Sequence, residues 1–313
     1  MNSEYDLIQQ DNLMRDLAEY NSLTEYEMPE CKRSFKLLGG TITIGIYDID
    51  QILLDGLFEE LYKEGLRLEK IFNFFDSTSE LSMLNKNRVL KVSEELLTVI
   101  KKGSGYAEMT DGAYDITLGK NIMNRKRNLE LVKLGCSYKD IIIKGNIVAL
   151  NHPDILIDLG SIAKGYIADM IIEYMKKLGI ENGFIDARGD LRIFGKALEI
   201  VQVQHPRIEE KGLRKIIFKN MSIATSGDYK QYYGSYEKSH IIGNKDVISV
   251  TVVADELVDA DALATCLFVI GLENIEKLMD GRNASAYVID KDLKEYYFNG
   301  FQNLIIDENK LMQ

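Results

Sequence analysis

Asp261 and Thr265 are the pair of side chains whose types and spacing are best suited to chemistry. They lie four residues apart, so on a helix both would face the same way. A carboxylate and a hydroxyl are hard oxygen ligands of the kind that Mg²⁺ prefers. The competing interpretation is that Asp259 or Asp261 only caps the start of a helix, which is a far commoner role for aspartate. Residue spacing alone therefore indicates a cation site and leaves a capping role open.

The segment from Asp158 to Gly165 is suited to binding a phosphate. Ser161 is of the type that caps a helix, and Lys164 would then lie in the first helical turn. Free N–H groups, the positive end of the helix dipole and a nearby lysine together favour an anionic group. In the alternative interpretation, Ser161 only caps the helix and Asp158 only pairs with Lys164.

Three further features carry less weight. The run from Ala224 to Asp228 has small hydroxyl residues and a glycine that let a ligand approach the backbone, although the pattern alone favours a plain turn. The tripeptide from Arg188 to Asp190 spells a cell-adhesion motif, which we reject because it lies within an apolar strand pattern. The histidines, His152, His205 and His240, have no metal-type partner three or four residues away, and a lone histidine is usually structural.

Periodicity predicts the elements that must position these residues. Apolar alternation or short apolar runs predict strands, and apolar stripes at helical spacing predict helices. The predicted strands are 41–48, 183–194, 199–204, 247–254, 284–289 and 295–298, with a hairpin at 140–150. The predicted helices are 53–72, one that Ser93 caps and that runs towards Met109, 161–178 ended by Gly179, and a buried helix at 261–270. Helices and strands mix without regular βαβ alternation, so we expect an α+β fold rather than a doubly wound sheet.

Composition limits the class of protein. The chain has 313 residues, of which 46% are hydrophobic, enough for a sizeable core. Its 38 basic and 49 acidic residues give a formal charge of −11, which argues against a nucleic-acid-binding surface. Three dispersed cysteines without a C-x-x-C pair favour a reducing compartment and no zinc site.

We expect residues 1–30 to form a polar extension with one helix near 4–20, ended by Pro29. Residues 31–313 should form one domain whose folded body starts at Arg33.

Taken together, the segments above resemble the ApbE family of FAD:protein FMN transferases, which implies that family's α+β fold. The resemblance spans roughly residues 38–289 and keeps the family's motif order throughout. The matching segments are Gly40-Thr41, Ser79–Asn85 (Ser-Glu-Leu-Ser-x-x-Asn), Gly112–Thr117 (Gly-Ala-Tyr-Asp-x-Thr), Asp158–Tyr166 (Asp-Leu-Gly-x-x-Ala-Lys-Gly-Tyr), Ala224–Gly227 (Ala-Thr-Ser-Gly) and Ala260–Thr265 (Ala-Asp-Ala-x-Ala-Thr). Each motif is weak alone, but their shared order along one chain is specific.

The resemblance implies a site for FAD and Mg²⁺. The metal ligands that it implies are Asp261, Thr265, the backbone carbonyl of Ser161 and the Ala264 region. The residues that it implies for FAD are Ser79, Asn85, Ala113, Tyr114, Asp115, Asp158, Lys164, Gly189, Asp190, Thr225, Ser226 and Gly227. His240 stands where the family's histidine stands and is our first choice of catalytic base, with Asp261 as the second.

The reaction that the resemblance implies moves the FMN half of FAD onto a Ser or Thr hydroxyl of a target protein and releases AMP. Targets in the family are flavin-carrying subunits of Rnf- and Nqr-type electron-transport complexes. Two other functions stay open: an FAD pyrophosphatase, in which water replaces the hydroxyl, and a non-catalytic FAD carrier. They stay open because the family's Asp-Pro-x-Thr-Gly segment is missing after His240, where Ile241 to Asp246 follows instead.

Other departures from the family pattern concern single positions and the chain start. The family often has Gly-Gly-Asp or Gly-Gly-Asn where Arg188–Asp190 stands, and a tyrosine where Phe75 stands. Many relatives are exported lipoproteins, whereas this sequence shows neither a signal-peptide pattern nor an apolar run of membrane-spanning length. We therefore expect the protein in the cytoplasm or on the inner face of the membrane.

Overall fold

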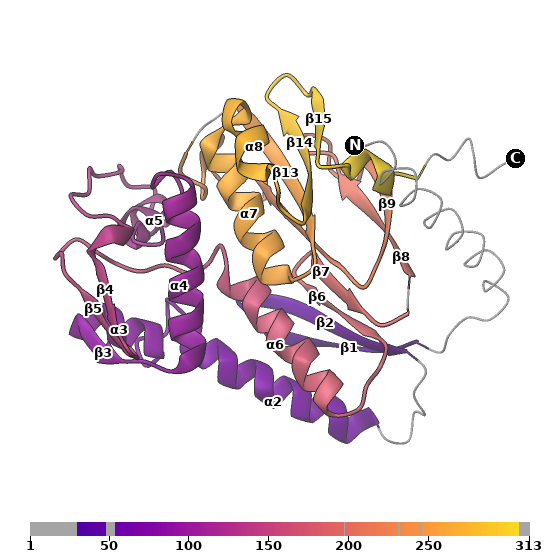
Figure 1. Cartoon of the computed structure of the whole chain (residues 1–313), viewed down its shortest axis with the longest axis horizontal. Coiled ribbons are helices and arrows are strands. Elements are labelled where there is room, and N and C mark those ends of the chain that lie inside the picture. Colours follow the sequence, from indigo (N-terminus) through magenta and orange to yellow (C-terminus); the bar gives the residue numbers. More distant parts are fainter. Residues whose placement is uncertain (1–29, 48–53, 197, 231, 244–245, 307–313) are drawn as a thin grey trace, which may run out of the picture.

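The structure is a computed structural model that describes residues 30–47, 54–196, 198–230, 232–243 and 246–306 (Figure 1). The helix predicted near 4–20 and the role of Pro29 lie outside these residues. Strand β1 begins at Glu30, so the folded body starts earlier than the predicted Arg33. The architecture mixes antiparallel sheets with helices, which confirms the predicted α+β class.

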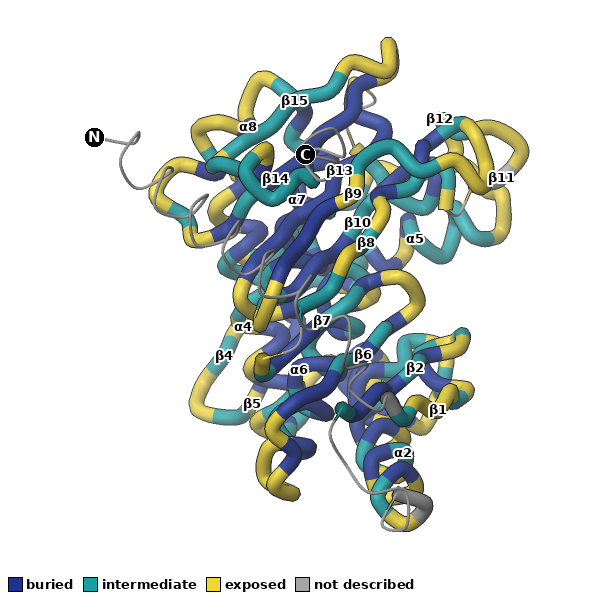
Figure 2. The backbone as a smooth tube through the Cα atoms, turned by 90° about the vertical axis from the view of Figure 1, so that its right-hand side faces the viewer, coloured by how far each residue is buried: buried dark blue, intermediate teal, exposed yellow. Residues whose placement is uncertain are grey.

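An antiparallel sheet of eight strands forms the centre of the molecule. In spatial order its strands are β1 (Glu30–Leu37), β2 (Gly40–Tyr47), β6 (Gly183–Ala187), β7 (Asp190–Phe194), β10 (Ser222–Gly227), β13 (Val247–Ala254), β14 (Ala284–Asp290) and β15 (Glu295–Phe298). Every residue of β13 is buried, so both faces of the sheet are covered here (Figure 2). A continuous apolar run such as Val247–Ala254 is the pattern expected of a strand covered on both faces.

Two different layers cover the sheet. On one face lie α2 (Leu54–Phe72), α6 (Ala163–Lys177), α7 (Leu257–Ile270) and α8 (Leu272–Met279) (Figure 1). On the other face a second core forms against the hairpin of β8 (Leu198–Gln204) and β9 (Gly212–Lys219) and the 3₁₀ turn η3 (Phe301–Leu304). A short hairpin of β11 (Tyr232–Tyr233) and β12 (Ser235–Ser239) precedes His240.

A smaller lobe packs beside the helical layer (Figure 1). It contains α3 (Glu80–Asn87), α4 (Glu94–Met109), α5 (Gly119–Lys126) and the 3₁₀ turn η2 (Tyr138–Asp140). Its three-stranded sheet has the order β3 (Val89–Lys91), β5 (Ile147–Leu150) and β4 (Ile141–Lys144). Ser93 accepts a hydrogen bond from the Leu96 N–H, so the predicted cap of α4 is confirmed. The predicted hairpin at 140–150 is also confirmed, as β4 and β5.

Two sequence predictions are wrong in instructive ways. The segment 183–194, predicted as one strand, is the hairpin of β6 and β7, because Arg188 and Gly189 both take positive φ and reverse the chain. The adhesion-like tripeptide therefore lies at a turn, not inside a strand.

The predicted helix 161–178 starts only at Ala163. Its N-cap is Ile162, which makes no side-chain capping bond, so Ser161 is not the cap.

Helices α6 and α7 cap each other's first turns. Each begins without a side-chain cap of its own. The Asp261 carboxylate of α7 accepts the Gly165 N–H of α6 at 3.0 Å. In return, the Asp169 carboxylate of α6 accepts the N–H groups of Leu257 and Val258 at 3.0 and 2.8 Å. Asp261 is therefore a cap, as one interpretation held, but it caps a different helix from its own.

Gly165 makes this crossing possible. A Cβ built there would lie 2.4 Å from the Leu257 carbonyl oxygen and 2.7 Å from the Val258 Cα, both backbone atoms that cannot turn aside. Only glycine lets the two helices approach so closely. The spacing of Asp261 and Lys164 depends on this contact, because both side chains come from the crossing point.

We predict that Gly165→Ala destabilises the protein by about 2 kcal/mol, because overpacking against backbone outweighs the better helix propensity of alanine. Gly105→Ala in α4 is the matched control: an added Cβ meets nothing within 4 Å there, so this variant should gain about 0.5–1 kcal/mol. Urea unfolding monitored by circular dichroism measures both. Equal stability of the two variants would contradict the close crossing.

Candidate functional site: a cation-lined pocket over the α6–α7 crossing

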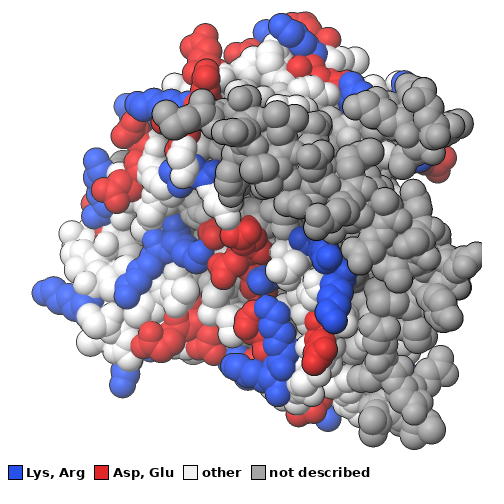
Figure 3. Space-filling view, turned by 45° about the vertical axis from the view of Figure 1, so that its right-hand side comes forward, with Lys and Arg blue, Asp and Glu red and all other residues white. Residues whose placement is uncertain are grey.

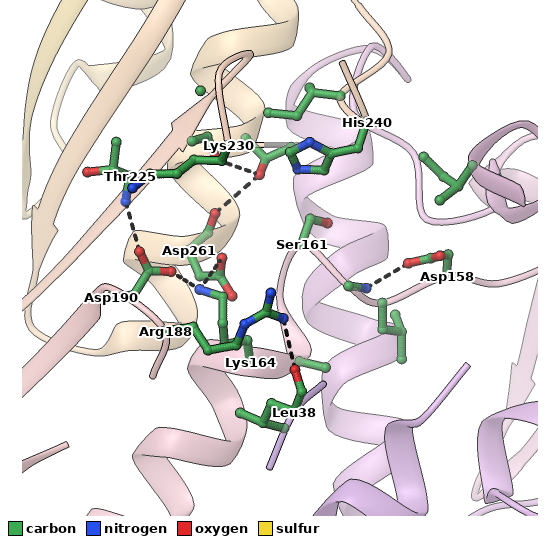
Figure 4. A pocket seen from close by; sticks show the side chains of 18 of the residues that line it. Leu38, Asp158, Ser161, Lys164, Arg188, Asp190, Thr225, Lys230, His240 and Asp261 are labelled. Carbon is green, nitrogen blue, oxygen red and sulfur yellow. Dashed lines mark hydrogen bonds and ion pairs between the residues drawn. The ribbon is translucent and has the colours of Figure 1, made fainter. Parts of the chain in front are cut away.

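A pocket of about 990 Å³ lies over the crossing of α6 and α7 (Figure 4). Its walls come from segments far apart in the sequence: the loop after α2, the turn at 113–115, α5, the loop at 158–161, the β6–β7 turn, β10 and the segment around His240. The volume is that of a ligand of nucleotide size rather than of a single ion.

Lys164 lies between two buried carboxylates at the floor of the pocket. Its ammonium pairs with Asp190 and lies 3.2 Å from Asp261 Oδ1. Asp190 also accepts the Thr225 N–H at 3.1 Å, which ties β10 to the same centre (Figure 4). The alternative interpretation of this segment, in which Lys164 only pairs with Asp158, is wrong, since Asp158 instead accepts the Gly160 N–H at 2.7 Å. One cation between two carboxylates leaves this centre with a net negative charge.

Hydroxyl groups surround this centre. Ser161 Oγ and the Tyr114 hydroxyl are 2.9 Å apart, and Ser226 Oγ and Thr265 Oγ1 are 3.0 Å apart. Burial raises the pKa of Tyr114 well above its usual value, so its hydroxyl stays protonated at neutral pH. Asp261, Thr265 and Ser161 all line the pocket, as the predicted cation site requires.

Most of the predicted ligand-binding residues line the same pocket. They are Ala113, Tyr114, Asp115, Asp158, Lys164, Gly189, Asp190, Thr225, Ser226 and Gly227. Asp115 is held by its own turn, because its carboxylate accepts the Thr117 N–H at 2.8 Å and the Tyr138 N–H at 2.9 Å. Burial raises the pKa of Asp158, while the Gly160 N–H and Lys126 oppose that rise. The plain turn that the pattern favoured for 224–228 is wrong for 224–227, which are the end of strand β10.

Three predicted site residues are buried away from the pocket, and the structure gives two of them positioning roles. Ser79 is fully buried and caps α3, accepting the Ser82 N–H at 3.0 Å. The Asn85 side chain bonds the N–H and the carbonyl of Ile157, both at 2.8 Å, and so fixes the loop that carries Asp158. Ala264 is fully buried and does not line the pocket. Ser79 and Asn85 therefore support the walls of the pocket, whereas Ala264 is a core residue between Asp261 and Thr265, which do line it.

His240 lines the pocket directly after strand β12, and Figure 4 shows its ring facing the cavity above Asp261. His152 and His205 do not line it. His205 has a structural role, because its Nδ1 accepts the N–H groups of Arg207 and Ile208 at 3.0 and 3.1 Å. Of the three histidines, only His240 is therefore placed to act on a ligand.

Sequence reasoning missed two pocket cations, Lys126 and Lys230. Lys126 is the last residue of helix α5. This helix was not predicted, because it is mostly polar and has no apolar stripe. The Lys126 ammonium lies 4.1 Å from the centre of the exposed Phe75 ring. Lys230 donates to Gln204 Oε1 at 2.9 Å, and burial lowers its pKa. Isolated lysines carry no spacing signal, so only the fold could have brought these two into the site.

The chain belongs to the ApbE family, whose model matches residues 38–289. Two curated relatives are named FAD:protein FMN transferase. The one from Vibrio cholerae is 28% identical over 285 residues, covering 80% of this chain and 83% of that protein. The one from Escherichia coli K12 is 25% identical over 277 residues, covering 77% and 79%.

Solved structures agree with this assignment. The flavin transferase ApbE from Vibrio cholerae superposes with a TM-score of 0.77 at 26% identity, covering 89% of this chain and 100% of that one. The ApbE protein of Thermotoga maritima gives 0.79 at 25% identity, with the same coverages. Residues 38–289, which the family model matches, include α6, α7 and every residue that lines the pocket.

Two searches of the described residues bear on metals and membranes. No three His, Cys, Asp or Glu side chains gather there as a cation site. Within the same residues, no helix has both the length and the apolar character needed to cross a bilayer.

We predict that Lys164→Met destabilises the protein by about 3 kcal/mol, because it leaves two buried carboxylates without their cation. Lys230→Met is the matched control: it removes from the same pocket a cation that contacts an amide and the Tyr229 ring but, among the described residues, pairs with no carboxylate. This variant should cost less than about 1 kcal/mol. Thermal and urea unfolding give both values. A small loss in Lys164→Met would mean that the ion pairs seen here contribute little.

Proposed function

We propose that the protein is an Mg²⁺-dependent FAD:protein FMN transferase. The observation that carries this proposal is the centre of Lys164, Asp190 and Asp261 in a nucleotide-sized pocket, in a chain that matches the ApbE family over residues 38–289. One phosphate of FAD would lie over this centre, where the α6 N-terminus, Lys164 and a bound Mg²⁺ would offset the charge of the two carboxylates.

The donor set fits a magnesium ion. Asp261 supplies a carboxylate, Thr265 a hydroxyl on the next turn of α7, and Ser161 lies across the pocket beside Tyr114. All are hard oxygen donors. Among the described residues, the Asp261 carboxylate oxygens bond only to Gly165 and Lys164, and a carboxylate has lone pairs to spare beyond these two bonds. When bound, Mg²⁺ would neutralise charge on the phosphoryl oxygens.

The residues of the chain would then divide the transfer step between them. The acceptor hydroxyl oxygen attacks the phosphorus of the FMN half, the bond to the bridging oxygen breaks, and AMP leaves with that oxygen. His240 would take the proton of the hydroxyl, because it lines the pocket and its ring faces the cavity (Figure 4). Lys164 would hold the phosphoryl group in line for attack.

The acceptor would be a flavin-carrying subunit of an Rnf- or Nqr-type complex, and the enzyme would act in the cytoplasm or on the inner face of the membrane. The test combines the protein with FAD, Mg²⁺ and such a subunit, followed by AMP quantification and in-gel flavin fluorescence under denaturing conditions. Labelled acceptor with AMP is the expected result. AMP with free FMN would identify a pyrophosphatase, and neither product would identify a carrier.

We predict that Asp261→Asn lowers FMN transfer at least about 100-fold at limiting Mg²⁺, because the anionic ligand is lost. The amide still accepts the Gly165 N–H, so the variant should stay folded by circular dichroism. Asp154→Asn is the matched control: it removes the same charge outside the pocket lining, where the Asp154 carboxylate accepts from Lys120, and should keep the parent rate of transfer. Unchanged transfer and unchanged Mg²⁺ dependence in Asp261→Asn would remove the metal assignment.

We predict that His240→Gln slows single-turnover transfer about 100-fold while the Kd for FAD changes less than threefold, since base catalysis typically contributes 10²–10⁴-fold. Stopped-flow transfer and isothermal titration measure the two quantities. Loss of FAD affinity with an unchanged transfer rate would make His240 a binding residue and not a base.

A further inference from the structure

Arg188 occupies a backbone position that suits glycine. It lies in the two-residue turn between β6 and β7 with φ 64, beside Gly189 with φ 94. A type I′ turn needs positive φ at both positions, and a side chain such as that of arginine costs about 1 kcal/mol there. A strained non-glycine residue at a pocket points to a use for its side chain.

The Arg188 side chain is held at the edge of the pocket. Its Nη1 donates to the Leu38 carbonyl at 2.9 Å, and its stem packs over Gly40, where an added Cβ would lie 2.6 Å from Arg188 Nε. Figure 4 shows the guanidinium between Lys164 and Asp158, facing the cavity. Among the described residues, the structure has no carboxylate in an ion pair with Arg188, so most of its N–H groups are available to a ligand.

Lys126 is the second cation of this part of the pocket. Its ammonium lies over the Phe75 ring and, within the described part of the chain, makes no ion pair. Burial lowers the pKa of Lys126, the negative charge of Asp158 raises it, and the positive charge of Arg188 lowers it. Lys126 and Arg188 are therefore close enough for their charges to interact. Two like charges facing one cavity without carboxylate partners repel each other, and an anion between them would relieve that repulsion.

Phe75 adds a flat surface to the two cations. Its ring is 65% exposed although it lines the pocket, so a ligand's ring system could stack on it. A phosphate carried by an aromatic nucleotide matches this combination of a ring surface with two cations.

We propose that Arg188 and Lys126 form a phosphate-binding subsite that holds one mononucleotide half of the substrate beside Phe75, separate from the centre of Lys164 and Asp261. The inference rests on the proposed function for the identity of the substrate. The ligand is a nucleotide phosphomonoester, and the two sources of that chemistry are AMP and FMN. A guanidinium offers two parallel N–H groups to phosphate oxygens, which a lysine cannot do.

The test measures the Kd of AMP and of FMN by isothermal titration, without acceptor protein and without any transfer reaction. Arg188→Gln and Lys126→Gln are each expected to weaken the binding of one of the two nucleotides about tenfold, and the same one in both variants, while the other changes less than twofold. Arg188→Lys should recover part of the loss. Because no turnover is measured, failure of FMN transfer would leave this result interpretable.

Two controls make the test specific. Lys120→Gln removes the same charge from the same helix outside the pocket, where Lys120 pairs with Asp154 at the surface, and should leave both Kd values unchanged. Arg188→Gly relieves the turn and should unfold at the same temperature as the parent or higher, while losing the same affinity as Arg188→Gln. Unchanged affinities in both Gln variants, or equal losses for AMP and FMN, would overturn the subsite.

Discussion

The reciprocal capping of α6 and α7 is the interaction on which the rest of the structure depends. A buried helix start must satisfy its first N–H groups, and neither helix carries a local cap that does so. Asp261 and Asp169 supply the missing acceptors from 96 and 88 residues away in the chain. The same bonds fix where Lys164 and Asp261 lie, so stability and the geometry of the site rest on one contact.

Charge is distributed to suit an anionic ligand in an acidic protein. The chain carries a formal charge of −11, and on the face drawn in Figure 3 acidic and basic side chains are interspersed over the described residues. The pocket lining also carries both signs: the cations Lys126, Lys164, Arg188 and Lys230, and the carboxylates Glu69, Asp115, Asp158, Asp190 and Asp261. Of these cations, only Lys164 is paired with carboxylates in the described structure. An anionic ligand would therefore meet Lys126, Arg188 and Lys230, which pair with no carboxylate among the described residues.

The sequence predicted the regular elements well and their junctions poorly. Helix α2 and strand β2 match their predicted ranges to within a residue, because long apolar stripes are strong signals. The β6–β7 turn was not predicted, because its first position is arginine and not the glycine or asparagine typical of such turns. Helix α5 and strand β9 were also missed, and Ser161 was taken for a cap that the fold supplies from α7.

The site could be predicted in part for the same reason. Motifs brought Asp261, Thr265, Lys164 and Asp158 together correctly, since all four line one pocket. Motif membership does not separate ligand contacts from supports, however. Ser79 and Asn85 hold neighbouring backbone and never reach the cavity. Lys126 and Lys230 belong to no motif, so three-dimensional structure was needed to find them.

The mutual dependence of α6 and α7 has a consequence for dividing this chain. A fragment ending before β13 would contain Asp169 but no helix for it to cap, and it would expose the first turn of α6. The complementary fragment would begin α7 with two unsatisfied N–H groups. Neither half could therefore build its share of the pocket in advance, and a split version would gain its ligand site only upon reassembly.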